Sequence, residues 1–262
     1  MPIDARIEAE KIRKMYNEQP QQDLARILLT GESGSGKTYL ATTAPKPVHI
    51  DSFDPGSSKG LKKWVDSGDI IVDSSYENED PMNPAVFRDW KNTLERRCQG
   101  KYFQAIGTYF LDSATTWTEA ILNFHQGKRS GAGTVPEWNK DYHPQKVDIR
   151  NYVRLIMAQP CHFVMTGHLE PQKDKEGNVI AKRFIMTGKG AVVIPLLFDE
   201  LWVSDSKETS KGSEYFIHLE KTGILLARSR LRARGILQGK EQANLRDILK
   251  RAGLSWEDKP AL

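Results

Sequence analysis

Short apolar runs and amphipathic stretches alternate along the first two thirds of the chain. The apolar runs have the length of buried strands, and they occupy residues 24–30, 47–52, 69–75, 105–113 and 161–168. Between them, apolar residues recur at helical spacing, as they do at every fourth position from Val86 to Cys98. We therefore expect an α/β fold with a mostly parallel central sheet and helices on both of its faces.

The last third of the chain has a different pattern. Apolar runs at residues 198–205 and 213–231 are joined by turns too short for a crossover helix, so these strands should be antiparallel to one another. A polar insertion at residues 169–190 has the pattern of a hairpin. Residues 244–254 predict a final helix that ends at Gly253. Antiparallel strands are thus expected at the C-terminal side of the parallel sheet.

One segment fits the phosphate-binding pattern G-x-x-x-x-G-K-[ST] without a mismatch. An apolar strand precedes it and a helical pattern follows it, which is the context that this loop requires. In such a loop, backbone N–H groups surround a phosphate, Lys37 reaches the β- and γ-phosphates, and Thr38 binds Mg²⁺. The sequence therefore predicts ATP and Mg²⁺ as cofactors, with the contacts Gly31, Glu32, Ser33, Gly34, Ser35, Gly36, Lys37, Thr38 and Tyr39.

A second metal-binding acid is expected on a strand beside the loop. Asp112 ends the apolar run at residues 105–113, and open α/β sheets bind their ligands at the carboxyl ends of the strands. We predict that Asp112 and Thr38 together hold the metal. An Asp at a strand end also serves turn geometry alone, and this alternative stays open.

Hydrolysis also requires a group that activates or positions water. Asp54 follows the second predicted strand and is the candidate catalytic acid, although its position equally suits a β-turn. Asp51, at the end of the same strand, is the alternative acid or a turn cap. Thr166 and His168 end the fifth predicted strand, where either side chain would sense the γ-phosphate by hydrogen bonding. For His168, a solvent-facing loop histidine is the alternative.

Taken in order, these motifs resemble the core of the RecA-like P-loop ATPases. The resemblance covers roughly residues 24–231 and runs through RILLTGESGSGKT, VHIDSFDPG, YFLDSATTW, HFVMTGH and TGKGAVVIPLLFDELWVSD. It looks closest to phage-encoded, AAA-type nucleotide-binding proteins, some of which act as single-strand annealing or recombination ATPases. It implies a RecA-like fold with an N-terminal extension (residues 1–23), an ATPase core (24–236) and a C-terminal helical tail (237–262).

The resemblance also implies roles for single residues, with one departure. Lys37 and Thr38 become the nucleotide and metal residues, Asp112 the second metal acid, and His168 or Thr166 the sensor. In the RecA-like pattern, a catalytic Glu follows the Asp at the end of the second strand. Here the stretch is Asp-Ser-Phe-Asp without a Glu, so Asp54 would substitute with a side chain one carbon shorter.

RecA-like recombinases carry two mobile loops that face single-stranded DNA. The resemblance places them at residues 125–143 and 170–190, and both segments contain basic and aromatic residues. That combination binds single strands without sequence preference. The predicted DNA contacts are Lys128, Arg129, Lys182, Arg183 and Lys189. Ordinary solvated loops are the alternative, because the second segment is also rich in acids.

Four arginines occupy alternate positions between residues 228 and 234. On a strand all four would project from one face, and their repulsion would favour a polyanion or a neighbouring subunit. In RecA-like assemblies a basic residue of one subunit reaches the nucleotide of the next, which makes Arg228 and Arg230 the candidate fingers. The alternative is a solvated edge strand that its charges protect from aggregation.

Composition adds little to this interpretation. The hydrophobic content of 39% and the charged content of 27% are ordinary for a globular protein, and the net charge of +4 neither requires nor excludes nucleic acid. Cys98 and Cys161 lie far apart without metal-ligand spacing, which is typical of reduced thiols in the cytoplasm, here the host cytoplasm if the protein is phage-encoded. No apolar run is long enough to span a bilayer, so no membrane partner is expected.

The function expected from these observations is a Mg²⁺-dependent ATPase that acts on single-stranded DNA in phage-type recombination, annealing or replication. Its expected partners are the DNA, further copies of itself in a ring or filament, and single-strand binding or recombination proteins. A slow nucleotide switch that regulates a protein partner without DNA is the main alternative, and the missing Glu favours it. A small-molecule kinase would share the phosphate loop, but the sequence has no distinct lid or acceptor-pocket signature.

Overall fold

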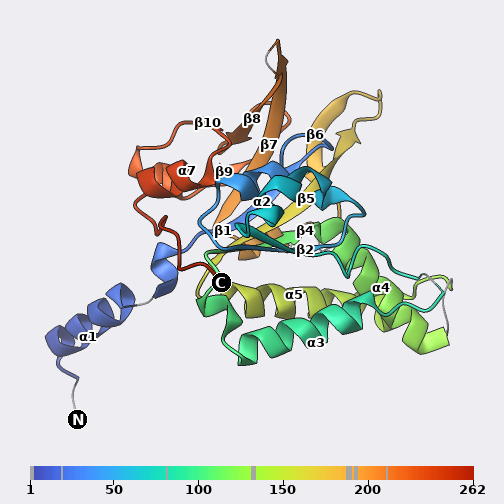
Figure 1. Ribbon diagram of the computed structural model, residues 1–262, viewed down its shortest axis with the longest axis horizontal. Coiled ribbons are helices and arrows are strands. Elements are labelled where there is room, and N and C mark those ends of the chain that lie inside the picture. Colours follow the sequence, from blue (N-terminus) through green and yellow to red (C-terminus); the bar gives the residue numbers. More distant parts are fainter. Residues whose placement is uncertain are drawn as a thin grey trace.

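In the computed structural model, strands from both halves of the chain meet in one central sheet (Figure 1). The structure describes residues 3–18, 20–80, 82–130, 134–186, 191, 194–210 and 212–262. Across the sheet the strand order is β10-β8-β7-β1-β5-β4-β2-β3, with β6 paired to β5 and β9 paired to β7. The strand that leads into the phosphate loop, β1 (Arg26–Gly31), therefore lies at the centre of the sheet.

The central strands are parallel, as the alternating pattern predicts. They are β1, β2 (Val48–Ser52), β3 (Ile70–Asp73), β4 (Thr108–Asp112), β5 (His162–Lys173) and β7 (Glu200–Thr209). Every residue of β1, β2 and β4 is buried, because helices cover both faces of a parallel sheet. The prediction of a mostly parallel α/β sheet is confirmed.

The later strands are antiparallel to one another, which also confirms the sequence prediction. β8 (Gly212–His218) pairs with β7 and with β10 (Lys240–Gln242), while β9 (Arg228–Ser229) pairs with β7. The polar insertion is a hairpin, in which β6 (Val179–Phe184) folds back on the second half of β5. The sequence did not predict β10, because its three polar residues carry no apolar signal.

Helices form one layer on each face of the sheet (Figure 1). On one face, α3 (Val86–Gln99), α4 (Ala114–Ser130) and α5 (His143–Met157) pack around Trp90 and Trp117. On the other, α7 (Leu245–Arg251) and the short helix η2 (Thr38–Thr43) pack around Trp202. The remaining short helices are α2 (Lys62–Asp66), η1 (Pro20–Asp23), η3 (Ser57–Leu61), η4 (Tyr102–Gln104), η5 (Trp138–Tyr142), η6 (Ile194–Leu197) and η7 (Leu231–Arg234).

The N-terminal helix, α1 (Ala5–Asn17), projects away from this body (Figure 1). It buries none of its residues, and Asp4 caps it by accepting hydrogen bonds from the backbone N–H groups of Arg6 and Ile7.

The helix after the phosphate loop differs from the expected α-helix. Residues Thr38–Thr43 form a six-residue 3₁₀ helix. The hydroxyls of Thr42 and Thr43 donate to the carbonyls three residues earlier, at 2.8 and 3.0 Å. Such side-chain bonds compete with the regular i→i−4 pattern, and β-branched residues are weak α-helix formers. As a result, this segment forms the tighter 3₁₀ turn in place of an α-helical turn.

The first predicted DNA loop is also shorter than expected, because α4 continues to Ser130. A Cβ on Gly127 would lie 2.8 Å from the ring of Pro84. This glycine therefore allows α4 to pack closely on the loop before α3. Lys128 and Arg129 lie in the last helical turn, where cations interact favourably with the helix dipole. These two residues are helical, and their prediction as part of a loop was wrong.

The prediction that four arginines line one face of a strand was wrong as well. Only Arg228–Ser229 are in a strand, and residues Leu231–Arg234 form η7. The buried carboxylate of Glu200 accepts the backbone N–H groups of Arg230 and Leu231 at 2.8 and 3.3 Å, which turns the chain out of the sheet. The strand therefore ends before the alternation can place the arginines side by side.

Candidate nucleotide site

The phosphate loop joins β1 to η2 at the carboxyl edge of the sheet. Gly34 and Gly36 have φ angles of +76° and +89°, the left-handed region that residues with a Cβ rarely adopt. A Cβ on Gly31 would lie 2.3 Å from the Oγ of Ser35. The glycines of the motif are thus explained by backbone conformation and by close approach.

Lys37 lies beneath the loop. Its side chain is buried, and Nζ donates hydrogen bonds to the carbonyls of Gly31 at 3.0 Å and Glu32 at 2.8 Å. Burial lowers the pKa of Lys37, while the nearby carboxylates of Asp112, Asp54 and Glu32 oppose the shift. The sequence motif therefore places a cation in a partly dry position beside the loop backbone.

A cavity of about 360 Å³ opens beside the loop. It is lined by Ser33, Gly34, Gly36, Lys37, Thr38, Tyr39, Asp54, Ser57, Asp112, His168 and Tyr215. The structure thus brings the phosphate loop together with the predicted acids from the ends of β2 and β4 and with the predicted sensor from β5. These strands are neighbours in the sheet, so their carboxyl ends converge.

Asp112 and Thr38, the predicted metal ligands, lie side by side. The Thr38 hydroxyl donates to Asp112 Oδ2 at 2.8 Å, and the Thr166 hydroxyl donates to Oδ1 at 2.5 Å. Burial raises the pKa of Asp112; the two hydroxyl bonds oppose this rise and the charge of Asp54 adds to it. A hydroxyl and a carboxylate side by side are the hard oxygen ligands that Mg²⁺ prefers.

The loop itself fits a phosphate group. The Oγ of Ser35 is buried and has no hydrogen-bond partner among the described residues, and buried polar atoms of this kind normally have one. Lys37 supplies a positive charge, and Gly34 and Gly36 keep side-chain atoms off the loop backbone at two positions. The residues present therefore suit a nucleoside triphosphate with its Mg²⁺: Lys37 and the loop would hold the phosphates, and Thr38 with Asp112 the metal.

Asp54 is strongly engaged within the chain. Its carboxylate accepts hydrogen bonds from Ser113 Oγ at 2.9 Å, from His168 Nε2 at 3.1 Å and from the Thr116 hydroxyl. Although burial raises the pKa of Asp54, the bonds from His168, Thr116 and Ser113 lower it overall. His168 pairs with Asp54 at the cavity rather than facing solvent alone. Thr166 donates its hydrogen bond to Asp112.

Asp51 lies away from the cavity. It is fully buried on the α3 side and accepts bonds from His49, Trp90, Arg97 and Tyr109 at 2.6 to 2.9 Å. It neither caps a turn nor faces the nucleotide loop.

His49, Asp51 and Asp73 lie close enough together for a metal ion. However, Arg97 donates to Asp51 at 2.9 Å and to Asp73 at 2.6 Å. The guanidinium already pairs with both carboxylates, so the cluster is an ion-pair network that fastens α3 to the sheet.

Sequence reasoning missed two residues of the cavity, Tyr215 and Ser57. The ring of Tyr215, from β8, lies 4.8 Å from that of Tyr39, and a Cβ on Gly36 would lie 2.4 Å from the Tyr215 ring. Tyr215 therefore closes over the phosphate loop from a strand far along the chain. Neither residue belongs to a motif, so spacing alone had no means of finding it.

The second predicted DNA loop is the β5–β6 hairpin. Lys182 forms an ion pair with Glu32 of the phosphate loop, while Arg183 is exposed on the same strand. Lys189 lies outside the described residues. One of the predicted DNA contacts is thus tied directly to the nucleotide loop.

The basic residues at the end of α4 have different surroundings. Arg129 forms ion pairs with Asp141 at 3.0 Å and Glu137 at 2.7 Å, so its charge holds the following segment against the helix. Lys128 is exposed, with Nζ 4.4 Å from the ring centroid of Phe124. Of the two, Lys128 has the charge that a DNA phosphate would reach.

Neither candidate finger residue lines the cavity beside the chain's own phosphate loop. Arg228 pairs with Leu201 at the amino end of β7, whereas Ser204, towards the carboxyl end, donates to the Ser35 carbonyl. Arg230 forms an exposed ion pair with Asp199 at 2.9 Å.

A family model described as an AAA domain matches residues 24–231. The chain belongs to the AAA domain family. The match spans β1 to the start of η7 and contains every element of the cavity. The chain therefore has the P-loop ATPase fold of a family that generally binds nucleotide.

No curated protein matches the sequence significantly. Among the described residues, no helix has the length and apolar character needed to cross a membrane.

Proposed function

We propose that this AAA domain is a Mg²⁺-dependent ATPase that acts on single-stranded DNA in phage-type recombination, annealing or replication. One observation carries the proposal: β5 carries Thr166, which bonds Asp112, and His168, which lines the nucleotide cavity, and then continues as the first strand of the basic hairpin. A change at the nucleotide is therefore transmitted to the hairpin through a continuous strand.

Three contacts link the hairpin to the site. Thr166 bonds Asp112, His168 bonds Asp54, and Lys182 pairs with Glu32. A metal ion held by Asp112 would compete with the hydroxyl of Thr166, and a phosphate on the loop would add negative charge near the Lys182–Glu32 pair. Nucleotide binding would thus reposition the hairpin and its cations, as in other nucleotide-dependent switches.

We expect single-stranded DNA to stimulate ATP hydrolysis and to bind with an affinity that falls as salt increases. ATP turnover, measured with and without an oligonucleotide across a salt series, tests this directly. Arg183→Gln should weaken DNA binding without changing basal turnover, because Arg183 is exposed on the hairpin. Arg96→Gln, which changes an exposed arginine in the last turn of α3, is the matched control.

The DNA role would be rejected by turnover that ignores the oligonucleotide together with the absence of salt-sensitive DNA binding. Such a result, with ATP binding intact, would leave the second candidate, a slow nucleotide switch that regulates a protein partner.

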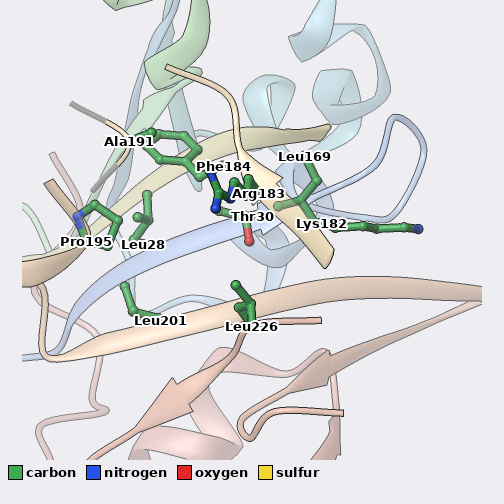
Figure 2. Close-up of a pocket in the computed structure, with 10 residues that line it drawn as sticks. All are labelled: Leu28, Thr30, Leu169, Lys182, Arg183, Phe184, Ala191, Pro195, Leu201 and Leu226. Atoms are coloured by element: carbon green, nitrogen blue, oxygen red, sulfur yellow. The ribbon is translucent and has the colours of Figure 1, made fainter. Parts of the chain in front are cut away.

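A cavity beside the hairpin favours this second candidate. It has a volume of about 310 Å³, and Figure 2 shows Leu28 and Leu201 around it together with Leu169 and Phe184 of the hairpin. Leu226, which is half exposed, completes its apolar wall. An apolar side chain of a protein partner would fit there, next to the Lys182–Glu32 pair.

The proposal includes a homo-oligomer, a ring or a filament, in which Arg230 acts on the neighbouring nucleotide. Arg230→Ala should lower turnover by about 1000-fold while ATP affinity stays unchanged, because Arg230 is exposed and does not line its own nucleotide cavity. Turnover and ATP affinity should be measured on the assembled protein. If Arg230→Ala loses nucleotide binding as fully as a Lys37 variant, the finger role is wrong.

The expected setting of this activity is the cytoplasm, that of the host if the protein is phage-encoded. Single-strand binding and recombination proteins are the partners that the DNA role implies.

A further inference from the structure

A chain of hydrogen bonds leads from the nucleotide cavity to a carboxylate outside its lining. Ser57 lines the cavity, and its Oγ lies 2.9 Å from the Oγ of Ser52. Ser52 Oγ donates in turn to Glu77 Oε1 at 2.7 Å. The second carboxylate oxygen of Glu77 accepts the backbone N–H of Gly56 at 2.9 Å. Glu77 is thus joined to the cavity through two hydroxyl groups.

The direction of this chain follows from counting protons. A serine hydroxyl has one proton to donate, and Ser52 gives its proton to Glu77. Ser57 must then be the donor in its bond to Ser52. The Ser57 oxygen therefore has only lone pairs to offer a water molecule in the cavity, so Ser57 is fixed as a hydrogen-bond acceptor.

Asp54, the other acid near this position, is a poorer proton acceptor. Asp54 accepts bonds from three side chains, and those bonds keep its pKa below the ordinary value despite burial. A carboxylate in this state is a weak proton acceptor. Glu77 comes from the segment after β3, so it supplies from elsewhere in the chain the glutamate that is missing after β2.

We propose that Ser57 accepts a proton from the water that attacks the γ-phosphate and that Glu77, through Ser52, is the final proton acceptor. This inference rests on the proposed ATPase activity of the same site. The water oxygen forms a bond to the γ-phosphorus, and the bond from that phosphorus to the β–γ bridging oxygen breaks. One water proton passes to Ser57, the Ser57 proton to Ser52, and the Ser52 proton to Glu77. The return of this proton along the chain to the released phosphate restores the carboxylate.

Glu77→Gln tests this role, because the amide oxygen can still accept from Ser52 but the amide cannot take up a proton; its NH2 group gives up the bond from the Gly56 N–H. We expect turnover to fall by about 100-fold, the usual size of a lost proton acceptor, with unchanged affinity for Mg²⁺–ATP. Ser57→Ala should give a similar loss through a small change that leaves Glu77 in place. Glu77→Asp should restore part of the turnover.

Glu79→Gln is the matched control, since Glu79 lies in the same segment but accepts its bond from Asn123 on α4. Its turnover should equal that of the wild type. The recovery in Glu77→Asp is the readout that a structural role would not give, because the shorter side chain restores the carboxylate but not the original packing.

The relay is rejected if Glu77→Gln and Ser57→Ala hydrolyse ATP at the wild-type rate. It is also rejected if both variants lose turnover only in proportion to lost ATP binding, which would indicate that Glu77 merely supports the loop at residues 52–57. A loss of turnover of about 100-fold in Asp54→Asn, with wild-type turnover in Glu77→Gln, would assign the acceptor to Asp54. A wild-type protein that binds ATP without hydrolysing it would overturn the ATPase proposal itself, and the relay with it.

Discussion

Replacement of Lys37 by alanine is expected to weaken Mg²⁺–ATP binding by about 100-fold, since a hydrogen bond to a charged group contributes roughly 3 kcal/mol. Turnover should fall below detection, because the same cation stabilises the charge that develops on the transferred phosphoryl group. Nζ is buried beside the loop carbonyls of Gly31 and Glu32, so no neighbouring lysine can take its place without moving the loop.

The measurement is ATP affinity by calorimetry together with steady-state turnover. Lys62→Ala is the control, because Lys62 pairs with Asp66 on the exposed surface of α2 and should leave both quantities unchanged. Thermal melting of the two variants separates loss of binding from loss of fold. Wild-type ATP affinity in a folded Lys37→Ala variant would contradict the assignment of the phosphate loop.

Replacement of Asp112 by asparagine should have two opposite effects. Mg²⁺-dependent turnover should fall by at least about 100-fold, because a metal ion stabilises transition-state charge by several kcal/mol. In the absence of metal, however, the variant should melt at a higher temperature than the wild type. Burial raises the pKa of Asp112, which means that the ionised carboxylate is disfavoured in the folded protein.

The sign of the pH effect follows from the same shift. A carboxyl group with a raised folded pKa contributes stability that is complete below its unfolded pKa and is lost as pH rises through the folded value. The advantage of Asp112→Asn in melting temperature should therefore be largest at neutral pH and disappear under acid conditions. Mg²⁺ should raise the melting temperature of the wild type and leave that of the variant unchanged.

Melting curves with and without Mg²⁺, over a pH series, check both parts. Asp66→Asn is the control, because Asp66 lies on the exposed surface. Asp73→Asn is unsuitable because Asp73 pairs with Arg97. A metal-free Asp112→Asn protein less stable than the wild type would contradict the view that this carboxylate is held in place for a cation.

The strong local signals of the sequence correspond to the part of the fold that was predicted. Buried parallel strands are nearly continuous apolar runs, so β1, β2, β4 and the first half of β5 were evident without neighbours. The phosphate loop was evident because its glycines meet local backbone demands, such as the positive φ of Gly36.

Weak local signals gave the errors. The alternating arginines had the period of a strand, but a tertiary contact from Glu200 to the backbone of Arg230 ends that strand. Lys128 and Arg129 were expected in a loop because glycines follow them in the sequence. In the structure α4 continues through both residues, and its Gly127 packs closely on Pro84. Tertiary context overrides local propensity at such positions.

By itself, the sequence determined the order of the strands along the chain, the phosphate loop and the acid at the end of β4. These features depend on residues close together in the chain. Only the tertiary structure decided which side chains meet at the loop: His168 with Asp54, Tyr215 with Tyr39, and Ser57 with Ser52 and Glu77. Apart from Ser57 and Ser52, these partners come from different strands and segments, and their approach depends on sheet order and register, which no local spacing encodes.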